Sequence, residues 1–339
     1  MSPEDQAELT KNAVSKVSDE YDADVLCYMG NLFPNRDREV LRLCRSRQRK
    51  RKNLVLILAT PGGSADSAYR ISHCLQRSYS EEGGGSGRFY LYAPDFCKSA
   101  GTILALGADN IIMSQVAELG PIDVQLRKEE EVGEWASGLN ATEALGQLQE
   151  QALSLFFETF KRMRFDRELG FSTRVSTEVA TNLAIGVMQP MYSQIDPVRL
   201  GELQRFVRIS LEYGDRLASS NVRRGTIEKL VVGYPSHGFI IDRSEARQLF
   251  NRVEKPSDSL ELLGQLELRA AFDAGAFEDE RSTPTIRYIN DELEQDAEPA
   301  ASNSKATGGS KTSRKRARSA AGSGKSRATK ANGAAPRQS

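Results

Sequence analysis

The stretch Asn53-Leu-Val-Leu-Ile-Leu-Ala-Thr-Pro-Gly-Gly-Ser64 decides the fold of this chain. Its apolar run at residues 54–59 is too short for a stable helix and is typical of a strand buried on both faces. Gly62 and Gly63 permit a sharp turn that leaves their backbone N–H groups uncovered. Ser64 can cap a helix expected over residues 65–79. This order predicts an α/β fold with N–H donors at the carboxyl edge of a parallel sheet, where such sheets bind ligands.

A second unit of the same kind reads Phe89-Tyr-Leu-Tyr-Ala-Pro-Asp-Phe-Cys-Lys-Ser-Ala-Gly101. We expect a strand over residues 88–93 and a helix of small residues from Ser99 to Ala108. Ser99 therefore lies at a strand-to-helix turn, where a hydroxyl is exposed and the helix dipole favours negative charge. Ser99 is the candidate nucleophile.

Three motifs, at residues 60–64, 99–101 and 119–123, together resemble the serine peptidases of the Clp protease and signal peptide peptidase A superfamily. The serine dehydrogenase proteinase branch is the most similar. The resemblance covers residues 24–253 and is strong in the motifs. It implies a ClpP/crotonase-like spiral of parallel strands with flanking helices. It also implies that Ser99 is the nucleophile and that the N–H groups of Gly63 and Ala100 form an oxyanion hole.

The base that would accept the Ser99 proton is left open by the sequence. Clp proteases use a histidine later in the chain, at a place where this sequence has Val124. The serine dehydrogenase proteinase branch has the order Ser, Asp, His, which here corresponds to Ser99, Asp123 and His237. His237 could instead cap the turn at residues 236–238, and Asp123 could serve its own turn, because aspartates are common in turns. Signal peptide peptidase A uses a lysine, and the alternative bases in this chain are Lys98, Lys128 and Lys161.

Composition excludes several other kinds of site. The chain has four cysteines without a CxxC pair and only two histidines, so we expect neither a zinc site nor any other metal or cofactor. The glycine run at residues 83–87 lacks the Gly-Lys-Ser/Thr ending of a phosphate loop, so we expect no dependence on ATP. No signal peptide or apolar run of about 20 residues is present, so no membrane span is expected. The isolated cysteines suit a reducing compartment, and we expect a soluble, cytoplasmic protein.

The sequence divides into three parts. We expect an N-terminal arm at residues 1–22, a catalytic domain at 23–270 and a disordered, basic tail at 271–339. Residues 299–339 contain ten Lys or Arg and no Asp or Glu, whereas the rest of the chain has a net charge of −10. Such a tail can bind nucleic acid non-specifically through its phosphates, or it can dock on the acidic body.

Periodicity predicts the remaining elements. Strands are expected at residues 23–29 and 110–114, and a short one near Val231 before Asp242, which can cap a helix. Helices are expected at residues 36–48, 141–167, 176–185 and 201–219, and a loop at 189–200. The long helices after residue 141 have apolar faces, and superfamily members assemble, so we expect a homo-oligomer.

Three functions fit these features. The first is a serine peptidase that acts on peptide or protein substrates. The second is a catalytically degenerate fold-mate that binds peptides or partners without cleaving them, since the histidine expected near Val124 is missing. The third is an acyl-CoA enzyme, because crotonases share this spiral and its paired N–H groups. Those enzymes have no serine at the place of Ser99, which disfavours the third function.

Overall fold

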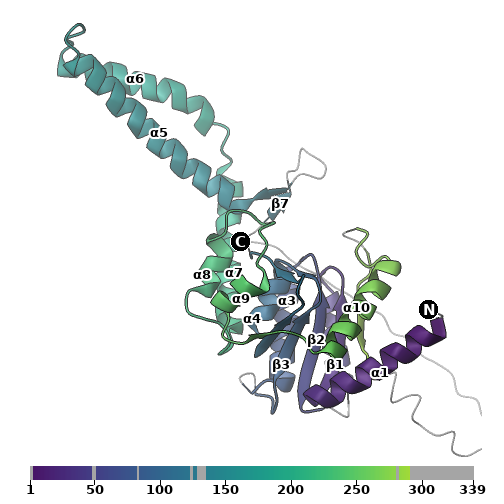
Figure 1. The fold of residues 1–339 in the computed structure, drawn as a ribbon. Coiled ribbons are helices and arrows are strands. Elements are labelled where there is room, and N and C mark those ends of the chain that lie inside the picture. The colour runs from purple at the N-terminus through teal and green to yellow at the C-terminus, as the bar shows by residue number, and fades with distance from the viewer. Residues whose placement is uncertain are drawn as a thin grey trace, which may run out of the picture. The chain divides into compact units, whose positions relative to one another are not determined.

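The computed structural model describes residues 3–47, 51–81, 84–122, 125–127, 135–279 and 282–290. In this part of the chain the largest sheet has six strands in the order β10-β1-β2-β3-β5-β9. The strands are β1 (Ala23–Met29), β2 (Asn53–Ala59), β3 (Phe89–Ala93), β5 (Asn110–Met113), β9 (Val253–Glu254) and β10 (Thr285–Tyr288). All neighbours are parallel except β10, which is antiparallel to β1. Helices flank the sheet (Figure 1), and the predicted α/β class with a parallel sheet is confirmed.

The helices of the described chain are α1 (Pro3–Tyr21), α2 (Arg36–Ser46), α3 (Ala65–Tyr79), α4 (Ala100–Leu106), α5 (Gly138–Phe165), α6 (Thr173–Tyr192), α7 (Pro197–Leu217), α8 (Thr226–Val232), α9 (Arg243–Leu249) and α10 (Asp258–Asp273). Ser64 caps α3 by accepting a hydrogen bond from the N–H of Ser67, and Asp242 caps α9 through the N–H of Glu245. Both predicted caps are confirmed.

The apolar run of β2 is buried on both faces of the sheet, as predicted. Leu54, Leu56 and Leu58 lie in the core that includes α2, α3, α4 and α8. The alternate residues Val55 and Ile57 lie in a second core, with α1 and α10. Because strand side chains alternate between faces, one continuous apolar run serves both layers.

Two helices differ from the sequence prediction. The loop expected at residues 189–200 is mostly helical, since α6 continues through Pro190 to Tyr192 and α7 begins at Pro197. A proline in the last turn of a helix removes few hydrogen bonds, and a proline in the first turn removes none. Asp196 accepts from the N–H groups of Val198 and Arg199, which fixes the start of α7.

Two further predictions are corrected near the chain's end. The strand expected near Val231 is instead the last turn of α8. Residues 285–288, which the sequence assigned to a disordered tail, form β10. Residues 285–288 alternate polar and apolar side chains, but four residues are too few to predict a strand. Their pairing with β1 forms only in the folded chain.

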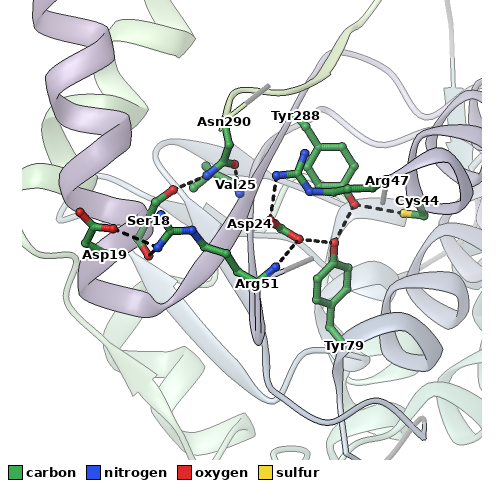
Figure 2. Close-up of polar contacts among 10 residues, drawn as sticks. All are labelled: Ser18, Asp19, Asp24, Val25, Cys44, Arg47, Arg51, Tyr79, Tyr288 and Asn290. Atoms are coloured by element: carbon green, nitrogen blue, oxygen red, sulfur yellow. Dashed lines mark hydrogen bonds and ion pairs between the residues drawn. The ribbon is translucent and has the colours of Figure 1, made fainter. Parts of the chain in front are cut away.

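A buried polar network lies near the amino end of β1, at the opposite end of the strands from the glycine turn (Figure 2). The Asp24 carboxylate forms an ion pair of 2.8 Å with Arg47 and accepts a hydrogen bond of 2.8 Å from the Tyr79 hydroxyl. The Tyr288 hydroxyl of β10 lies 3.1 Å from the Tyr79 hydroxyl, and the Arg47 guanidinium lies 4.5 Å from the centre of the Tyr288 ring. Burial raises the pKa of both tyrosines, so these hydroxyls stay protonated hydrogen-bonding groups.

Asn290, which follows β10, extends this network to α1. The Asn290 side-chain oxygen accepts a hydrogen bond of 2.6 Å from the N–H of Val25, and its amide group bonds to Ser18. Buried polar groups are costly unless they are paired, so the network favours one register of β10 on β1.

The helices α5 and α6 pack side by side as a hairpin (Figure 1). Ser176, Ala180 and Met188 are the buried residues of α6.

No helix in the described part of the chain combines the length and the apolar character that a membrane crossing requires.

Candidate active site

Ser99 lies between the short strand β4 (Phe96–Cys97) and α4, as the sequence predicts. Its backbone has φ 51° and ψ −111°, and a positive φ is uncommon for a residue with a side chain. The N–H groups of Thr102 and Ile103 donate to the Ser99 carbonyl at 2.9 and 3.2 Å, so the first turn of α4 holds this conformation. Strained backbone of this kind clusters at functional sites.

The glycine turn after β2 lies directly against Ser99. A Cβ atom on Gly62 would approach the Ser99 Cβ to 2.9 Å and its Oγ to 3.4 Å, so the Gly62 Cα faces the serine side chain. Gly62 and Gly63 have φ of 123° and 133°, which residues with side chains rarely adopt. A larger residue at Gly62 would collide with the Ser99 side chain, and one at Gly63 would collide with the backbone of Leu32.

Hydrogen bonds to Leu32 orient the N–H of Gly63. The N–H of Leu32 donates to the Gly62 carbonyl at 2.8 Å, and the N–H of Ser64 donates to the Leu32 carbonyl at 2.6 Å. In a parallel ladder, a residue flanked by two such hydrogen bonds points its own N–H away from the neighbouring strand. The N–H of Gly63 therefore points away from Leu32. The segment next to the turn on that side is the one before Ser99, since Thr60 pairs with Cys97.

Ala100 supplies a second donor beside Ser99. It is the first residue of α4, and the first N–H groups of a helix have no partner within the helix. The dipole of α4 adds partial positive charge at this end. The N–H groups of Gly63 and Ala100 are thus the candidate donors for an oxyanion in acyl transfer.

Cys97 has a packing role and does not act as a second nucleophile. Its side chain is fully buried, and desolvation raises the pKa of its thiol well above the ordinary value. A Cβ atom on Gly101 would meet the Cys97 sulfur at 2.9 Å, so the thiol fills the space beneath the first turn of α4.

The strand β6 (Glu118–Leu119) forms one wall of the site. It pairs with β4, and Leu119 also exchanges hydrogen bonds of 2.9 and 3.0 Å with Ile241. The buried Thr102 hydroxyl donates to the Gly120 carbonyl at 2.7 Å and accepts from the Gly120 N–H at 3.2 Å. Thr102 therefore fixes this wall to the helix that begins at Ser99.

Lys98 forms an ion pair of 2.7 Å with Glu118. Its ammonium group therefore donates to a carboxylate, which is the opposite of what a base for Ser99 requires. Burial, with a smaller effect from Glu118, raises the pKa of the nearby Asp95 carboxyl. The charges beside the nucleophile thus belong to one local cluster of Asp95, Lys98 and Glu118.

His237 lies in the turn between α8 and the Leu119–Ile241 bridge and is half-buried. The N–H of Phe239 donates to the Ser236 carbonyl at 3.1 Å across this turn. Ile241, four residues after His237, bridges to Leu119, which pairs with Cys97. The histidine thus sits on a segment that is tied to the wall of the site.

The other candidate residues lie on separate elements or outside the described residues. The structure brings together Ser99, Gly63, Ala100 and Lys98. Lys161 is exposed on α5, a helix that packs mainly against α6, α7 and the strand β8 (Trp135–Ser137), which pairs with β7 (Gln125–Arg127). Asp123 and Lys128 lie outside the described residues.

Sequence reasoning missed Leu32, Thr102 and Glu118. A threonine within the apolar stretch Ala100-Gly-Thr-Ile-Leu-Ala-Leu106 was the available signal for Thr102. Leu32 acts through its backbone, which leaves no signal in side-chain chemistry.

One family model matches part of the chain. Residues 33–144 match the family model described as ClpP-like SDH-type serine proteinase. The matched segment includes Gly63, Ser99, Ala100 and Asp123, and it ends before His237.

Two individual proteins are also similar to the chain. An uncharacterized protein of Methanocaldococcus jannaschii is 39% identical over 88 residues, which are 26% of this chain and 28% of that protein. The aligned region thus spans little more than a quarter of the relative. A mutant of the membrane-bound stomatin-specific protease 1510-N is 18% identical, with a TM-score of 0.29, covering 45% of this chain and 67% of its own.

Proposed function

Because residues 33–144 match the ClpP-like SDH-type serine proteinases, we propose that this chain is a serine peptidase with Ser99 as nucleophile. The Ser99 Oγ attacks the carbonyl carbon of a peptide bond and loses its proton to a base. The base then protonates the leaving amine, and water hydrolyses the acyl-enzyme. The N–H groups of Gly63 and Ala100 stabilise the oxyanion in both steps.

One observation carries the proposal, namely the close approach of the glycine turn to a strained serine. Packing of the core alone requires neither the positive φ of Ser99 nor the contact of Ser99 with Gly62. Acyl transfer needs both features, because the nucleophile and the oxyanion donors must converge on one carbonyl group.

We propose His237 as the base, with Asp123 as the residue that orients it. The order Ser, Asp, His of the family that the chain resembles supports this assignment, and Ile241, four residues after His237, bridges to Leu119. The pairing of Lys98 with Glu118 favours this assignment over a dyad of Ser99 with Lys98. If the base is a lysine after all, Lys128 and Lys161 are the two further candidates.

Fluorophosphonate labelling tests the function directly. We expect the native full-length chain to form one covalent adduct, which mass spectrometry of its peptides places on Ser99. The probe mimics the tetrahedral intermediate, so it needs the activated hydroxyl and the oxyanion donors together. The heat-denatured chain is the control and should remain unlabelled.

An absence of labelling in the folded chain would contradict the peptidase. It would instead favour a degenerate fold-mate that binds peptides or partners without cleaving them. A label on a serine other than Ser99 would assign the role of nucleophile to that serine.

Several wider properties complete the proposal. We propose that the peptidase is soluble, works without ATP and assembles with copies of itself. The substrates are peptides or proteins, and the isolated cysteines support a cytoplasmic location. We propose that the catalytic domain extends from residue 23 through β10 and that the basic C-terminal segment is accessory.

Deletion of residues 300–339 tests the role of that segment. The full-length chain should retard DNA or RNA at low salt, and the truncated chain should not, because the ten cationic residues of the segment release counterions from phosphates. A mobility-shift titration at several salt concentrations measures this. Peptidase activity should be unchanged, and equal retardation by the truncated chain would transfer the binding to the basic cluster at residues 45–52.

A further inference from the structure

The helix α6 exposes a continuous apolar stripe along its whole length. The stripe consists of Val175, Val179, Leu183, Val187 and Met191, spaced four residues apart. Each of these side chains is between 39% and 46% exposed. Residues four apart are offset by about 40° around a helix, so the stripe winds slowly round α6, and its central members Val179, Leu183 and Val187 share one face. Single exposed apolar residues are normal, whereas a row of them marks a contact surface.

The neighbouring helix α5 does not cover this stripe. The residues of α6 that are buried are Ser176, Ala180 and Met188. Each follows a residue of the stripe by one position, and one position turns an α-helix by about 100°. The packing of the hairpin therefore uses an adjacent face of α6 and leaves the stripe exposed.

The charges of α6 restrict what can cover the stripe. Arg174 and Glu178 are its two charged residues, and residues 179–192 have none. If a partner surface carried charged side chains, those side chains would lose their hydration on the stripe and would find no opposite charges there. The stripe therefore fits an uncharged, apolar helix of similar shape, and α6 of a second copy meets that description.

The order of residue types along the stripe is also nearly the same from either end of α6. Leu183 is its centre, with valines at Val179 and Val187 on the two sides and Val175 and Met191 at the ends. A two-fold interface requires a patch that complements itself in this way. Ridges of residues four apart on both helices pack into each other at an angle of about 50°.

We infer that two copies of this chain associate through α6, crossing antiparallel about a two-fold axis at Leu183. Leu183 then packs on Leu183 of the second copy, and Val179 lies beside the second copy's Val187. This inference names the surface and geometry of assembly, and it does not depend on the chemistry of Ser99.

Electrostatics selects the antiparallel orientation. A parallel pair would place Arg174 beside Arg174 and Glu178 beside Glu178. In the antiparallel pair the two Glu178 residues are ten helical positions apart, or about 15 Å along the axis. That separation exceeds the screening length of about 8 Å at physiological ionic strength, so their repulsion is weak.

The first test measures self-association of the full-length chain by sedimentation velocity over a range of concentrations. Leu183→Glu should weaken association by about 100-fold, because it places two carboxylates at the centre of the contact. Gln189→Glu is the matched control, since it adds the same charge to an exposed position of α6 about 160° from both Val187 and Met191. The control should associate like the unchanged chain.

Cysteine cross-linking tests the orientation. Val179→Cys mixed with Val187→Cys should form a disulfide-linked dimer under mild oxidation, and each variant alone should form much less. Efficient linking of Val179→Cys to itself would overturn the antiparallel geometry. The unchanged chain, which contains the half-buried Cys74, gives the background.

Other outcomes would overturn the inference as a whole. These are a chain that stays monomeric at tens of micromolar, or a Leu183→Glu variant that associates normally. Binding of the monomer to vesicles of phosphatidylcholine and phosphatidylserine through this stripe would assign it to a membrane surface instead. Circular dichroism of each variant verifies the helix content. Labelling at Ser99 is measured separately, so failure of this inference and failure of the peptidase are distinguishable.

Discussion

Replacement of Ser99 by alanine should abolish peptide hydrolysis and covalent labelling, with a fall in turnover of about 10⁴-fold or more. The change removes the attacking oxygen, and what remains is the small effect of the oxyanion donors and substrate binding. The fold should be retained, because the Ser99 side chain makes no capping hydrogen bond and its carbonyl still accepts from Thr102 and Ile103. Turnover of a peptide substrate and the thermal unfolding midpoint are the two measurements.

Ser257→Ala is the matched control for this variant. Ser257 caps α10 by accepting a hydrogen bond of 3.3 Å from the N–H of Leu260, far from the site in sequence. Its loss should lower the free energy of unfolding by about 1 kcal/mol and leave turnover intact. The two serine variants should thus show opposite patterns. Full activity in the Ser99 variant would remove this residue from the mechanism.

Replacement of His237 by alanine should lower turnover by about 10³-fold, since an unassisted serine hydroxyl is a weak nucleophile. A base must be neutral to accept a proton. The acidic limb of the pH profile of the unchanged chain should therefore be altered in the His237 variant. The pH profile of kcat/KM measures this effect.

The chain offers a close control, because its other histidine is His73. That ring stacks on Tyr69 at 5.7 Å between centroids, on the helix that follows the glycine turn. His73→Ala should leave the pH profile unchanged. If His237→Ala retains normal turnover while Lys98→Ala loses it, the base is a lysine and the Lys98–Glu118 pair must open during catalysis.

Local patterns predicted the centre of this fold well. The apolar run of β2 and the cap at Ser64 gave the bounds of β2 and α3 to within one residue, because both signals lie within the segment itself. The same local logic placed Ser99 at a strand-to-helix turn. The strain at Ser99 and the contact with Gly62 were beyond this reasoning, since they depend on how two units pack together.

Features that depend on distant partners were not predicted. The register of β10 is fixed by Tyr288 in the network around Asp24, and nothing in residues 285–288 alone signals that contact. Pro190 was taken as a break, although a proline near the end of a helix costs little. The ion pair of Lys98 likewise needed the pairing of β4 with β6, which the sequence did not reveal.

The pairing of β10 with β1 also bears on how the chain folds during its synthesis. Leu26 pairs with Tyr288, so a strand near residue 26 is completed by a strand that is made more than 250 residues later. Contacts so distant in sequence are slow to form, because a long loop must close first. Until β10 is made, β1 has an unpaired edge, and such edges invite pairing with other chains. A chain that has been made only as far as residue 284 therefore has β1 as an open sheet edge, and pairing with β10 closes it.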